Sequence, residues 1–461
     1  MYEIDELLKK VKRVHFIGIG GSGMCPLAEI LHKEGYELSG SDNNETDTLA
    51  RVRSLGIPVT LGQKAENIDG AELIVYTAAI LPDNPELVAA NNSGIPTVER
   101  ADLLGAITRL YSDCYCVCGT HGKTTVSSML TQIMIQCGKD PSAVIGGELP
   151  LIHSHGRVGE TQNMVCEACE FKDHFLKLDP DIAIILNVDA DHLEYFKNIE
   201  NIIKSFNKFA KMANKAVIYN GDDANTLKAV ADVGGKDMIT FGLDKSNDFH
   251  AENVEMVNAF AHFDAYKKGE KIGSVKLKVP GKHNVTNALA ALAAADYCGI
   301  SFDKAIASLE QFGGACRRFE ILAKLNGITF ADDYAHHPTE LRVTLEAAMQ
   351  MKYRKVWAVF QPFTYSRTYT LMDDFASALE IADKVVLTEI MGSREKNTYN
   401  VYSADLAAKI PGCKWFPTFE EVARYVADNA ESGDMIITLG CGDVYKVAFR
   451  IEEMLKEKYG E

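Results

Sequence analysis

Two apolar runs in this chain each end in a glycine-rich loop, and each loop leads into a segment with helical spacing. The first is VHFIGIGGSGM, residues 14–24, and the second is CYCVCGTHGKTT, residues 114–125. A buried strand that passes through glycines into a helix brings backbone N–H groups close to a phosphate. The sequence therefore predicts parallel sheets covered by helices and two separate phosphate-bearing ligands.

Apolar strands alternate with helical segments along the rest of the chain, and the glycine pair in QFGGACRRFE indicates a junction near residue 314. At roughly 150 residues per domain, this length favours about three domains. We expect an α/β protein whose three domains are each built on a mainly parallel sheet with flanking helices. The expected bounds are 1–109 and 315–461, both Rossmann-like, and 110–314, which carries the phosphate loop.

The composition excludes some classes of protein. A net charge of −16 argues against nucleic-acid partners, and no apolar run approaches the ~18 residues that a membrane span needs. The N-terminal residues lack the apolar core of a secretory signal, so we expect a cytoplasmic protein. Cys166 and Cys169 form a C-x-x-C, but no second pair follows, and reduced, buried thiols are favoured over a zinc or redox centre.

The first loop reads G-x-G-x-x-G at Gly18, Gly20 and Gly23, with Asp42 beyond the next strand. This is the dinucleotide-binding fingerprint, and taken alone it favours a nicotinamide or flavin enzyme. Any pyrophosphate ligand would require the same geometry. The loop by itself therefore leaves the ligand open.

The second loop is shorter than the usual G-x-x-x-x-G-K-[ST] pattern, since Gly119 and Gly122 stand only three residues apart. It still follows a strand and precedes a helix, as a phosphate loop does. Lys123 could then reach the β- and γ-phosphates, and the Thr124 hydroxyl could bind Mg²⁺. A second phosphate loop is difficult to reconcile with a plain dehydrogenase.

Acidic residues follow at the ends of the next strands, at Glu167, Glu170, Asp189 and Asp191, with His192 beside them. Magnesium takes hard oxygen ligands and needs only one or two carboxylates. These residues are therefore candidates for a metal site beside the phosphate loop.

Polar residues in three further segments are candidate ligand contacts. His283, Asn284 and Asn287 stand at a helix start, where Asn284 could cap the helix or read adenine. Arg317 or Arg318 at the domain junction could bind phosphate bidentately. The segment FADDYAHHPTE follows a strand whose carboxyl edge would line a binding crevice, and it contains Asp332, Asp333, Tyr334, His336 and His337.

Eight segments follow one another along the chain: FIGIGGSGM, GTHGKTT, DADHLEYF, GKHNVTNALAA, GACRRFE, DDYAHHPTEL, FQPFTYSRT and LGCGDVY. In this order they resemble the motifs of the Mur ligases, which are ATP-dependent amide ligases of cell-wall precursor synthesis. The similarity runs from residue 16 to about residue 445. It implies an N-terminal domain that binds UDP, a central domain that binds ATP, and a third domain that binds the incoming amino acid. It also implies UDP-N-acetylmuramate and L-alanine as substrates, ATP and Mg²⁺ as cofactors, and a monomer or homodimer.

The resemblance assigns roles by position. The UDP-sugar contacts would be Gly18, Gly20, Gly21, Ser22, Gly23, Met24, Asp42, Thr77 and Ala78. The ATP contacts would be Gly119, Thr120, His121, Gly122, Lys123, Thr124, Thr125, Asn284, Asn287, Arg317 and Arg318. Magnesium would lie among Thr124, Glu167 and His192. Tyr334, His336 and Arg367 would bind the amino acid, and the catalytic candidates are Lys123, Arg318, Asp333 and His336.

Two segments depart from the family pattern. EACEF stands where EADES is common, which leaves open whether Glu167 or Glu170 binds the metal. Phe363 and Thr364 replace a histidine and an arginine in FQPHRYSRT, within the expected amino-acid site. Two other functions stay open at this point: a related ligase that attaches a recycled tripeptide to the same nucleotide, and an NAD-dependent oxidoreductase.

Overall fold

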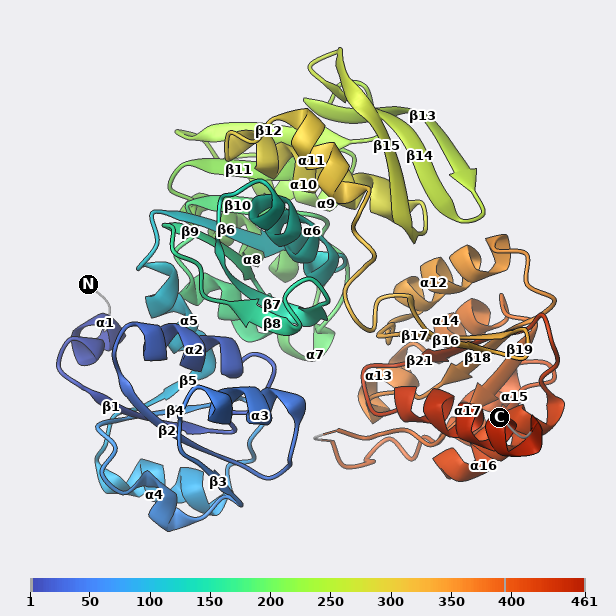
Figure 1. Ribbon diagram of the computed structural model, residues 1–461, viewed down its shortest axis with the longest axis horizontal. Helices are drawn as coiled ribbons and strands as arrows, with labels where there is room; N and C mark the ends of the chain where they lie inside the picture. The colour runs from blue at the N-terminus through green and yellow to red at the C-terminus, as the bar shows by residue number, and fades with distance from the viewer. Residues whose placement is uncertain (1–2, 394, 460–461) are drawn as a thin grey trace. The chain divides into compact units, whose positions relative to one another are not determined.

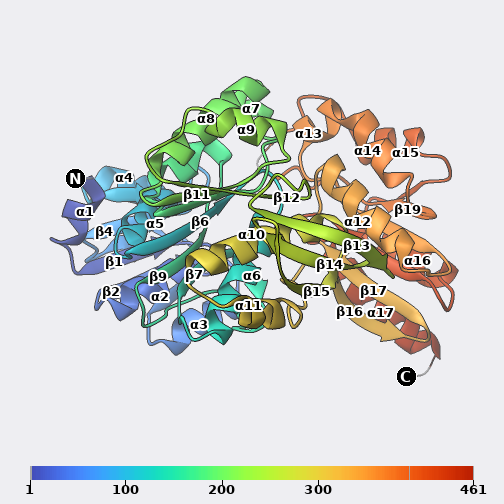
Figure 2. The same cartoon turned by 90° about the horizontal axis from the view of Figure 1, so that it is seen from above.

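A computed structural model describes residues 3–393 and 395–459, and the strands of these residues form three sheets (Figure 1). Helices flank each sheet, and most of the paired strands are parallel (Figure 2). The predicted three-sheet α/β fold is therefore confirmed. The boundaries proposed for the three domains stay predictions.

The first sheet has the strand order β3-β2-β1-β4-β5, and its four pairings are parallel. The glycine loop follows β1, at the centre of this sheet. Its strands are β1 (Arg13–Ile17), β2 (Glu37–Asp42), β3 (Val59–Leu61), β4 (Leu73–Tyr76) and β5 (Thr97–Glu99). Its helices are α1 (Glu3–Leu8), α2 (Cys25–Lys33), α3 (Asp47–Ser54), η1 (Ala65–Ile68), α4 (Pro85–Ser93) and α5 (Arg100–Thr108).

The second sheet has the order β15-β14-β13-β12-β11-β10-β6-β9-β7-β8, so the strand before the phosphate loop, β6, lies inside it. Its strands are β6 (Asp113–Cys118), β7 (Ser142–Leu149), β8 (Ser154–Arg157), β9 (Asn163–Glu167), β10 (Ile182–Ile185), β11 (Ala216–Asn220), β12 (Asp237–Gly242), β13 (Phe249–Val257), β14 (Phe260–Lys267) and β15 (Glu270–Pro280). Its helices are α6 (Lys123–Gln136), η2 (Phe171–Lys177), α7 (Leu193–Phe196), α8 (Ile199–Met212), α9 (Ala224–Val230), α10 (His283–Tyr297) and α11 (Phe302–Leu309).

The third sheet has the order β16-β17-β21-β18-β19-β20 and is parallel except for the β16–β17 pair. Its strands are β16 (Glu320–Leu325), β17 (Ile328–Asp333), β18 (Val356–Phe360), β19 (Lys384–Leu387), β20 (Lys414–Trp415) and β21 (Met435–Leu439). Its helices are α12 (Pro338–Gln350), α13 (Tyr365–Thr370), α14 (Met372–Leu379), α15 (Ser403–Lys409), α16 (Phe419–Asn429) and α17 (Tyr445–Tyr459).

The chain divides into two compact units. One comprises Met1–Asn253, Phe263–Val275 and Thr286–Phe312, and the other comprises Val254–His262, Lys276–Val285 and Gly313–Glu461. The glycine loop and the phosphate loop both belong to the first unit. No helix within residues 3–393 and 395–459 is long and apolar enough to span a membrane.

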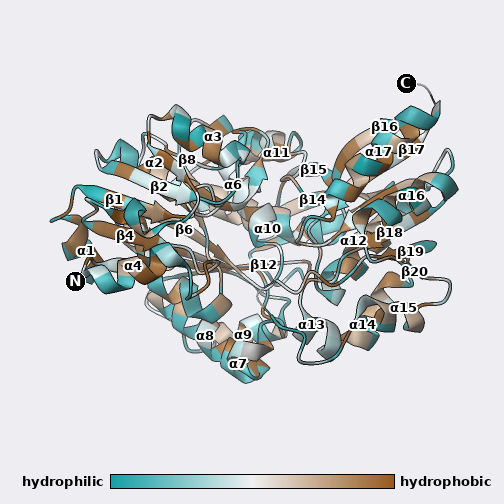
Figure 3. Cartoon of the chain, turned by 90° about the horizontal axis from the view of Figure 1, so that it is seen from below, coloured by the Kyte–Doolittle hydropathy of each residue, from teal (hydrophilic) through white to brown (hydrophobic). Residues whose placement is uncertain are grey.

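The cores explain why these segments become strands and helices. Strands such as β10 and β18 are buried along their whole length, as expected for apolar strands with helices on both faces. Helices are two-sided: α16 buries Val422, Ala423 and Val426 and carries hydrophilic residues elsewhere (Figure 3).

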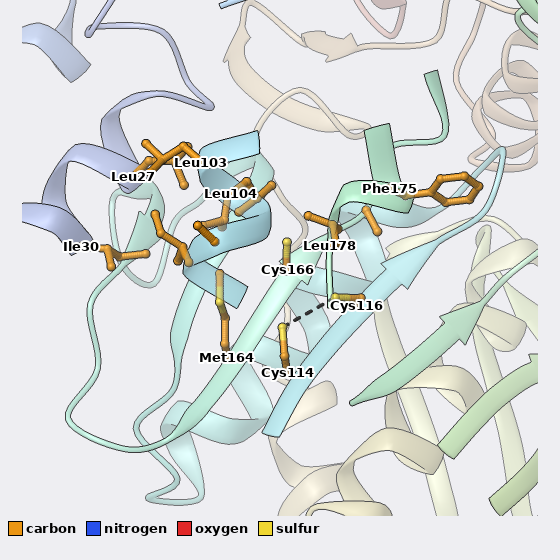
Figure 4. Packing of buried hydrophobic residues seen from close by; sticks show 14 of the residues in the cluster. Leu27, Ile30, Leu103, Leu104, Cys114, Cys116, Met164, Cys166, Phe175 and Leu178 are labelled. Atoms are coloured by element: carbon orange, nitrogen blue, oxygen red, sulfur yellow. Dashed lines mark hydrogen bonds between the residues drawn. The ribbon is translucent and has the colours of Figure 1, made fainter. Parts of the chain in front are cut away.

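The cysteines at the start of β6 belong to the hydrophobic core (Figure 4). Cys114 and Cys116 alternate along the strand, their Sγ atoms are 3.6 Å apart, and Cys166 of β9 lies in the same cluster. All eleven cysteines of the chain are free thiols. Among the described residues, no group of three or more His, Cys, Asp or Glu side chains is arranged to hold a metal ion.

Buried hydrogen bonds of Glu86 hold α4 against the first sheet. His15 Nε2 lies 2.6 Å from Glu86 Oε1, and Ser41 Oγ donates to the other carboxylate oxygen at 2.7 Å. The side chains of His15 and Glu86 are only 2% and 0% exposed, so water cannot replace a lost partner.

We therefore expect Glu86→Ala to lower the free energy of unfolding by about 2–6 kcal/mol, because His15 and Ser41 each lose a buried hydrogen-bond partner at a cost of about 1–3 kcal/mol. Urea denaturation followed by circular dichroism measures this loss. Glu6→Ala, which removes an exposed pair with Lys9, is the control and should leave the urea midpoint unchanged. Equal midpoints for Glu86→Ala and wild type would contradict the expectation.

Candidate functional site

The first glycine loop connects β1 to α2 in a conformation that depends on glycine. Gly18 has φ +83°, and a Cβ atom built on it would lie 3.2 Å from Cγ2 of Thr77. The backbone N–H groups of Gly18 and Ile19 donate to the carbonyl of Ser41 at 2.8 and 3.0 Å. These contacts fix the loop against β2 and the end of β4. The loop backbone therefore keeps one conformation at the start of α2.

The carboxylate of Asp42 connects this loop to the segment after β2 through two hydrogen bonds. One of its carboxylate oxygens accepts the N–H of Gly20 at 3.0 Å, and the other accepts the N–H of Asn44 at 3.2 Å. The structure thus brings together Gly18, Gly20, Asp42 and Thr77, as the sequence pattern predicts. Their roles in binding a nucleotide stay predictions.

Sequence reasoning missed a cation at the same loop. A Cβ atom built on Gly23 would lie 3.0 Å from Nη1 of Arg100, the first residue of α5. The guanidinium therefore lies against a loop shaped like a diphosphate site, where a positive charge would be useful. The sequence offered one signal: Arg100 directly follows a strand of the same parallel sheet.

The second glycine loop is held on the neighbouring strand β10. Gly119 and Gly122 have φ +145° and +86°, and a Cβ atom on Gly119 would lie 2.9 Å from Cβ of Leu186. Asn187, just after β10, accepts the His121 N–H at 2.8 Å and donates to the His121 carbonyl at 3.0 Å. Side chains at both glycines would collide with their neighbours, which accounts for this G-x-x-G spacing.

Thr120 and Asp189 add a further link between the two segments. The Asp189 N–H donates to Thr120 Oγ1 at 2.9 Å, and His121 Nε2 lies 3.3 Å from Asp189 Oδ2. Thr125 lies in the first turn of α6. These contacts fix the loop at the N-terminus of a long helix, which favours an anion there.

Lys123, the first residue of α6, is paired with Glu170. Its ammonium lies 2.9 Å from Oε2 and 3.0 Å from Oε1 of that glutamate, and it donates to the carbonyl of Gly119 at 2.6 Å. Burial lowers the pKa of Lys123, but the nearby charges of Glu170, Cys169 and Glu167 more than offset this and raise the pKa above its usual value. Lys123 is therefore a permanent cation at the phosphate loop.

Thr124 and Glu167 make a separate pair of oxygen donors. Thr124 Oγ1 donates to Glu167 Oε2 at 3.0 Å, and the Gly146 N–H donates to the same oxygen at 2.7 Å. A hydroxyl and a carboxylate side by side suit Mg²⁺, which prefers hard oxygen ligands and retains several waters. The two glutamates thus differ: Glu167 lies with the hydroxyl, whereas Glu170 lies with the lysine.

His192 lies at the start of α7 with φ +54°, and its ring centroid is 4.8 Å from that of Phe171. Whether it joins Thr124 and Glu167 at a metal stays a prediction. Asn287 does lie beside the phosphate loop, since a Cβ atom on Gly122 would meet its Oδ1 at 2.8 Å. Asn284 falls inside α10, and its amide donates to the carbonyl of Pro280 at 2.7 Å.

The two adjacent arginines before β16 have different environments. Arg317 donates to Asp332 at 2.8 Å and to the carbonyl of Gly440 at 2.7 Å, and its guanidinium lies 4.7 Å from the ring centroid of Tyr445. These contacts tie Arg317 into its own sheet. The guanidinium of Arg318 lies 5.1 Å from the ring centroid of Tyr334, and its charge acts on Asp333.

Asp333 is buried at the carboxyl end of β17. Its oxygens accept the N–H groups of Phe319 and Ala335 at 2.7 and 2.8 Å, and both carboxylate oxygens are thereby engaged. Burial raises the pKa of Asp333 to about 6, partly opposed by Arg318 and by these backbone donors. The carboxylate therefore fixes the backbone directly after Arg318 and directly after Tyr334.

An aromatic cluster surrounds His336. Its ring lies 5.7 Å from that of Tyr334 and 6.2 Å from that of Phe363, both edge to face, while its Nδ1 lies 3.0 Å from the Tyr334 carbonyl. Phe363 thus packs on the predicted amino-acid-binding histidine. Arg367 lies on α13, and its charge acts on Cys441, beyond the end of β21. Tyr334, His336 and Arg367 belong to one compact unit, and their role in binding the amino acid stays a prediction.

Three models of one known protein family together match most of the chain. The model described as "Mur ligase family, catalytic domain" matches residues 13–112, "Mur ligase middle domain" matches 117–295, and "Mur ligase, glutamate ligase domain" matches 317–442. The UDP-N-acetylmuramate–L-alanine ligase of Agathobacter rectalis is 44% identical over 99% of this chain and 100% of that protein. The chain belongs to the Mur ligase family.

Other Mur ligases are similar over the same length. The UDP-N-acetylmuramate–L-alanine ligase of Acetivibrio thermocellus is 45% identical over 97% of each chain. The crystal structure of the UDP-N-acetylmuramate–alanine ligase of Thermotoga maritima superposes with a TM-score of 0.82 at 29% identity, covering 97% of this chain and 99% of that one. The similarity therefore covers all three sheets.

Membership of the Mur ligase family also resolves the ambiguity of the first loop. Gly18, Gly20 and Gly23 lie inside the segment matched by a Mur ligase domain, so the fingerprint does not indicate a nicotinamide enzyme here. The oxidoreductase alternative loses the only motif that supported it.

Proposed function

We propose that this Mur ligase joins L-alanine to the carboxyl group of UDP-N-acetylmuramate, converting ATP to ADP and phosphate, in peptidoglycan precursor synthesis. The observation that carries the proposal is the 44% identity, over 99% of the chain, to a curated ligase with this name. The two glycine loops support it independently, because the reaction needs one site for a UDP diphosphate and another for ATP.

The UDP-sugar would bind at the first loop, with its diphosphate against the backbone of Gly18–Met24 and the start of α2. Asp42 and Thr77 shape this loop, and Ala78 continues the chain after Thr77. Arg100 would add a positive charge at Gly23. The carboxyl group of the muramyl lactyl ether would then extend toward the second loop.

ATP would bind as the second substrate at Gly119–Thr125, with its β- and γ-phosphates near Lys123. Asn284 and Asn287 are the proposed adenine contacts. Mg²⁺ would bind at Thr124 and Glu167, with His192 nearby, and when bound it would neutralise phosphate charge. Lys123 would neutralise further charge on the γ-phosphate, since its ammonium is held at the loop.

The first chemical step needs positive charge around the transferring phosphate. The muramyl carboxylate oxygen attacks the γ-phosphorus, the bond to the β-phosphate oxygen breaks, and an acyl phosphate and ADP result. Lys123 would stabilise the charge that develops on the phosphate. Arg318, with Arg317 beside it in the chain, is the arginine that we propose brings further positive charge to the nucleotide.

The second step joins the amino acid. The amine nitrogen of L-alanine attacks the acyl carbon, phosphate leaves, and the amine loses a proton. We assign the proton to His336 rather than Asp333, because the Asp333 carboxylate is buried and already accepts two backbone N–H groups. Tyr334 and Arg367 would position the amino acid beside it.

We place this reaction in the cytoplasm, where ATP and nucleotide sugars are available, and eleven free thiols suit a reducing compartment. The net charge of −16 disfavours nucleic acid as a partner. The enzyme would work as a monomer or homodimer, which light scattering would determine.

Phosphate release tests the proposed function. Purified protein should release phosphate from ATP only when Mg²⁺, UDP-N-acetylmuramate and L-alanine are all present. Equal release without the sugar nucleotide or without an amino acid would reject the proposal. A panel of glycine, L-serine and the tripeptide that a recycling ligase would use decides the amino substrate, because faster turnover with the tripeptide would favour that related activity.

A further inference from the structure

Strand β8 carries a histidine for which neither the fold nor the proposed chemistry accounts. His155 lies on β8, which pairs antiparallel with β7 so that Ser154 opposes Leu149. Because β7 is parallel to β9 and β9 is parallel to β6, the start of β8 lies at the carboxyl edge of the sheet, where the phosphate loop also lies. His155 is thus near the edge at which ligands bind in sheets of this kind.

The backbone of β8 is anchored to the helix that follows the first glycine loop. A Cβ atom built on Gly156 would lie 2.6 Å from Cβ of Pro26, in the first turn of α2. At the other end of α2, Lys33 donates to the carbonyl of Gly159 at 2.7 Å and pairs with Glu160 at 2.8 Å. The strand is therefore fixed next to the helix that begins at the proposed diphosphate site.

Side chains alternate along a strand, so His155 points away from α2 if Gly156 faces it. Val144 of β7 lies opposite Gly156 on β8 and opposite Cys166 on β9, so Glu167, the next residue of β9, faces the same side of the sheet as His155. Glu167 accepts hydrogen bonds from the Gly146 N–H and from Thr124. The charges of Glu148 and Glu167 both act on His155. His155 is thus linked to both glycine loops: the next residue, Gly156, packs on the helix that follows the first loop, and the side chain of His155 faces the same side as Glu167, which binds Thr124 of the second loop.

One ring nitrogen of His155 has no hydrogen-bond partner among the described residues. This nitrogen is Nδ1, and it is buried. Burial lowers the pKa of His155, although Glu148 and Glu167 act in the opposite direction, so the ring is neutral near pH 7. A neutral imidazole has a single N–H, and with no acceptor at Nδ1 that proton belongs on Nε2, which can present it to a ligand.

Within the proposed function, only one substrate has to extend from the first loop to the second. UDP-N-acetylmuramate places its diphosphate at one site and its lactyl carboxylate at the other. That carboxylate lies near the acidic side chains Glu148 and Glu167, so it needs hydrogen-bond donors as well as cations.

We infer that His155 is a positioning residue that donates a hydrogen bond from Nε2 to the lactyl carboxylate of UDP-N-acetylmuramate and so selects this nucleotide over UDP-sugars without that group. This rests on the proposed function. It adds a determinant of substrate choice that lies outside both glycine loops.

Binding measured by calorimetry with two ligands tests the inference. UDP-N-acetylglucosamine is the second ligand, because it lacks the lactyl ether but shares the UDP and the N-acetyl sugar. His155→Ala should weaken binding of UDP-N-acetylmuramate by about 10- to 100-fold, the value of one hydrogen bond to a charged group. Binding of UDP-N-acetylglucosamine should stay as in wild type. In turnover, KM should rise for UDP-N-acetylmuramate and stay constant for ATP.

Two further variants separate contact from structure. His155→Gln keeps an amide donor near the position of Nε2 and should recover most of the lost affinity. His153→Asn is the matched control, since His153 is exposed in the same hairpin and has φ +46°, which asparagine tolerates. This variant should bind both ligands as wild type does.

The outcomes distinguish this inference from the proposed function. If wild-type protein does not bind UDP-N-acetylmuramate, the proposed function fails and the inference fails with it. If wild type binds and His155→Ala binds equally well, only the inference is overturned. Equal weakening for both nucleotides would also overturn it, because the contact would then not be to the carboxylate.

Discussion

Lys123→Ala is expected to reduce kcat by at least about 10³-fold, because it removes the lysine that we propose binds the γ-phosphate of ATP. Binding of UDP-N-acetylmuramate should change little, since the first loop lies on a different sheet. Phosphate-release kinetics and calorimetry measure the two effects separately. A variant with normal turnover would show that the loop does not act on ATP.

A stability effect accompanies this substitution and has to be separated from it. Lys123 pairs with Glu170, whose side chain is only 4% exposed, so the single variant leaves a buried carboxylate without its cation. Such a loss costs about 3–5 kcal/mol. In the double variant with Lys123→Ala and Glu170→Gln the uncompensated charge is gone, so the free energy of unfolding should recover while turnover stays low. Recovery of turnover as well would mean that the single variant failed by unfolding.

Glu167→Gln is expected to lower kcat by about 10²- to 10³-fold and to raise the Mg²⁺ concentration needed for half-maximal rate. The amide keeps the size of the side chain but loses the negative charge that a hard cation requires. Thr124 and Gly146 both donate to the Glu167 carboxylate, so this oxygen lies where the loop hydroxyl can share a ligand. Initial rates across a magnesium titration measure both changes.

Glu170→Gln is the matched comparison, since both glutamates stand in the EACEF segment. Its carboxylate accepts a hydrogen bond from Lys123, so the Mg²⁺ concentration needed for half-maximal rate should shift much less than in Glu167→Gln. If instead Glu170→Gln raised the magnesium requirement and Glu167→Gln did not, the assignment of the two glutamates would be reversed.

Much of the fold was predictable from local patterns. Strand β10 is wholly apolar, and β6 and β21 are largely so, because both faces of their sheets are covered, and this leaves a clear signal in the sequence. Strands β13–β15 gave no such signal, because their residues alternate between buried and exposed. The sequence pattern also did not predict that β9 ends at Glu167, so that Glu170 falls outside the strand.

The candidate site was predictable only in part. Residues within a motif, such as Gly119, Gly122 and Lys123, could be found from spacing, because a phosphate loop needs them at fixed positions along the chain. Arg100 and His155 could not be found in this way. Each is an isolated residue in its own segment, and its relation to a loop depends on how separate elements pack.

The order of apolar runs, glycines and the G-K-T-T segment determined by itself that this chain has sheets of parallel strands, two phosphate loops and the motifs of a Mur ligase. These are local properties, fixed by backbone sterics and by the period of the hydrophobic pattern. Tertiary structure alone decided which glutamate accompanies Thr124 and which accompanies Lys123, and that Arg317 donates to Asp332 of its own sheet. Nearby residues of one type, such as Glu167 and Glu170, have different partners, so hydrogen-bond distances and burial rather than residue type settle those partners.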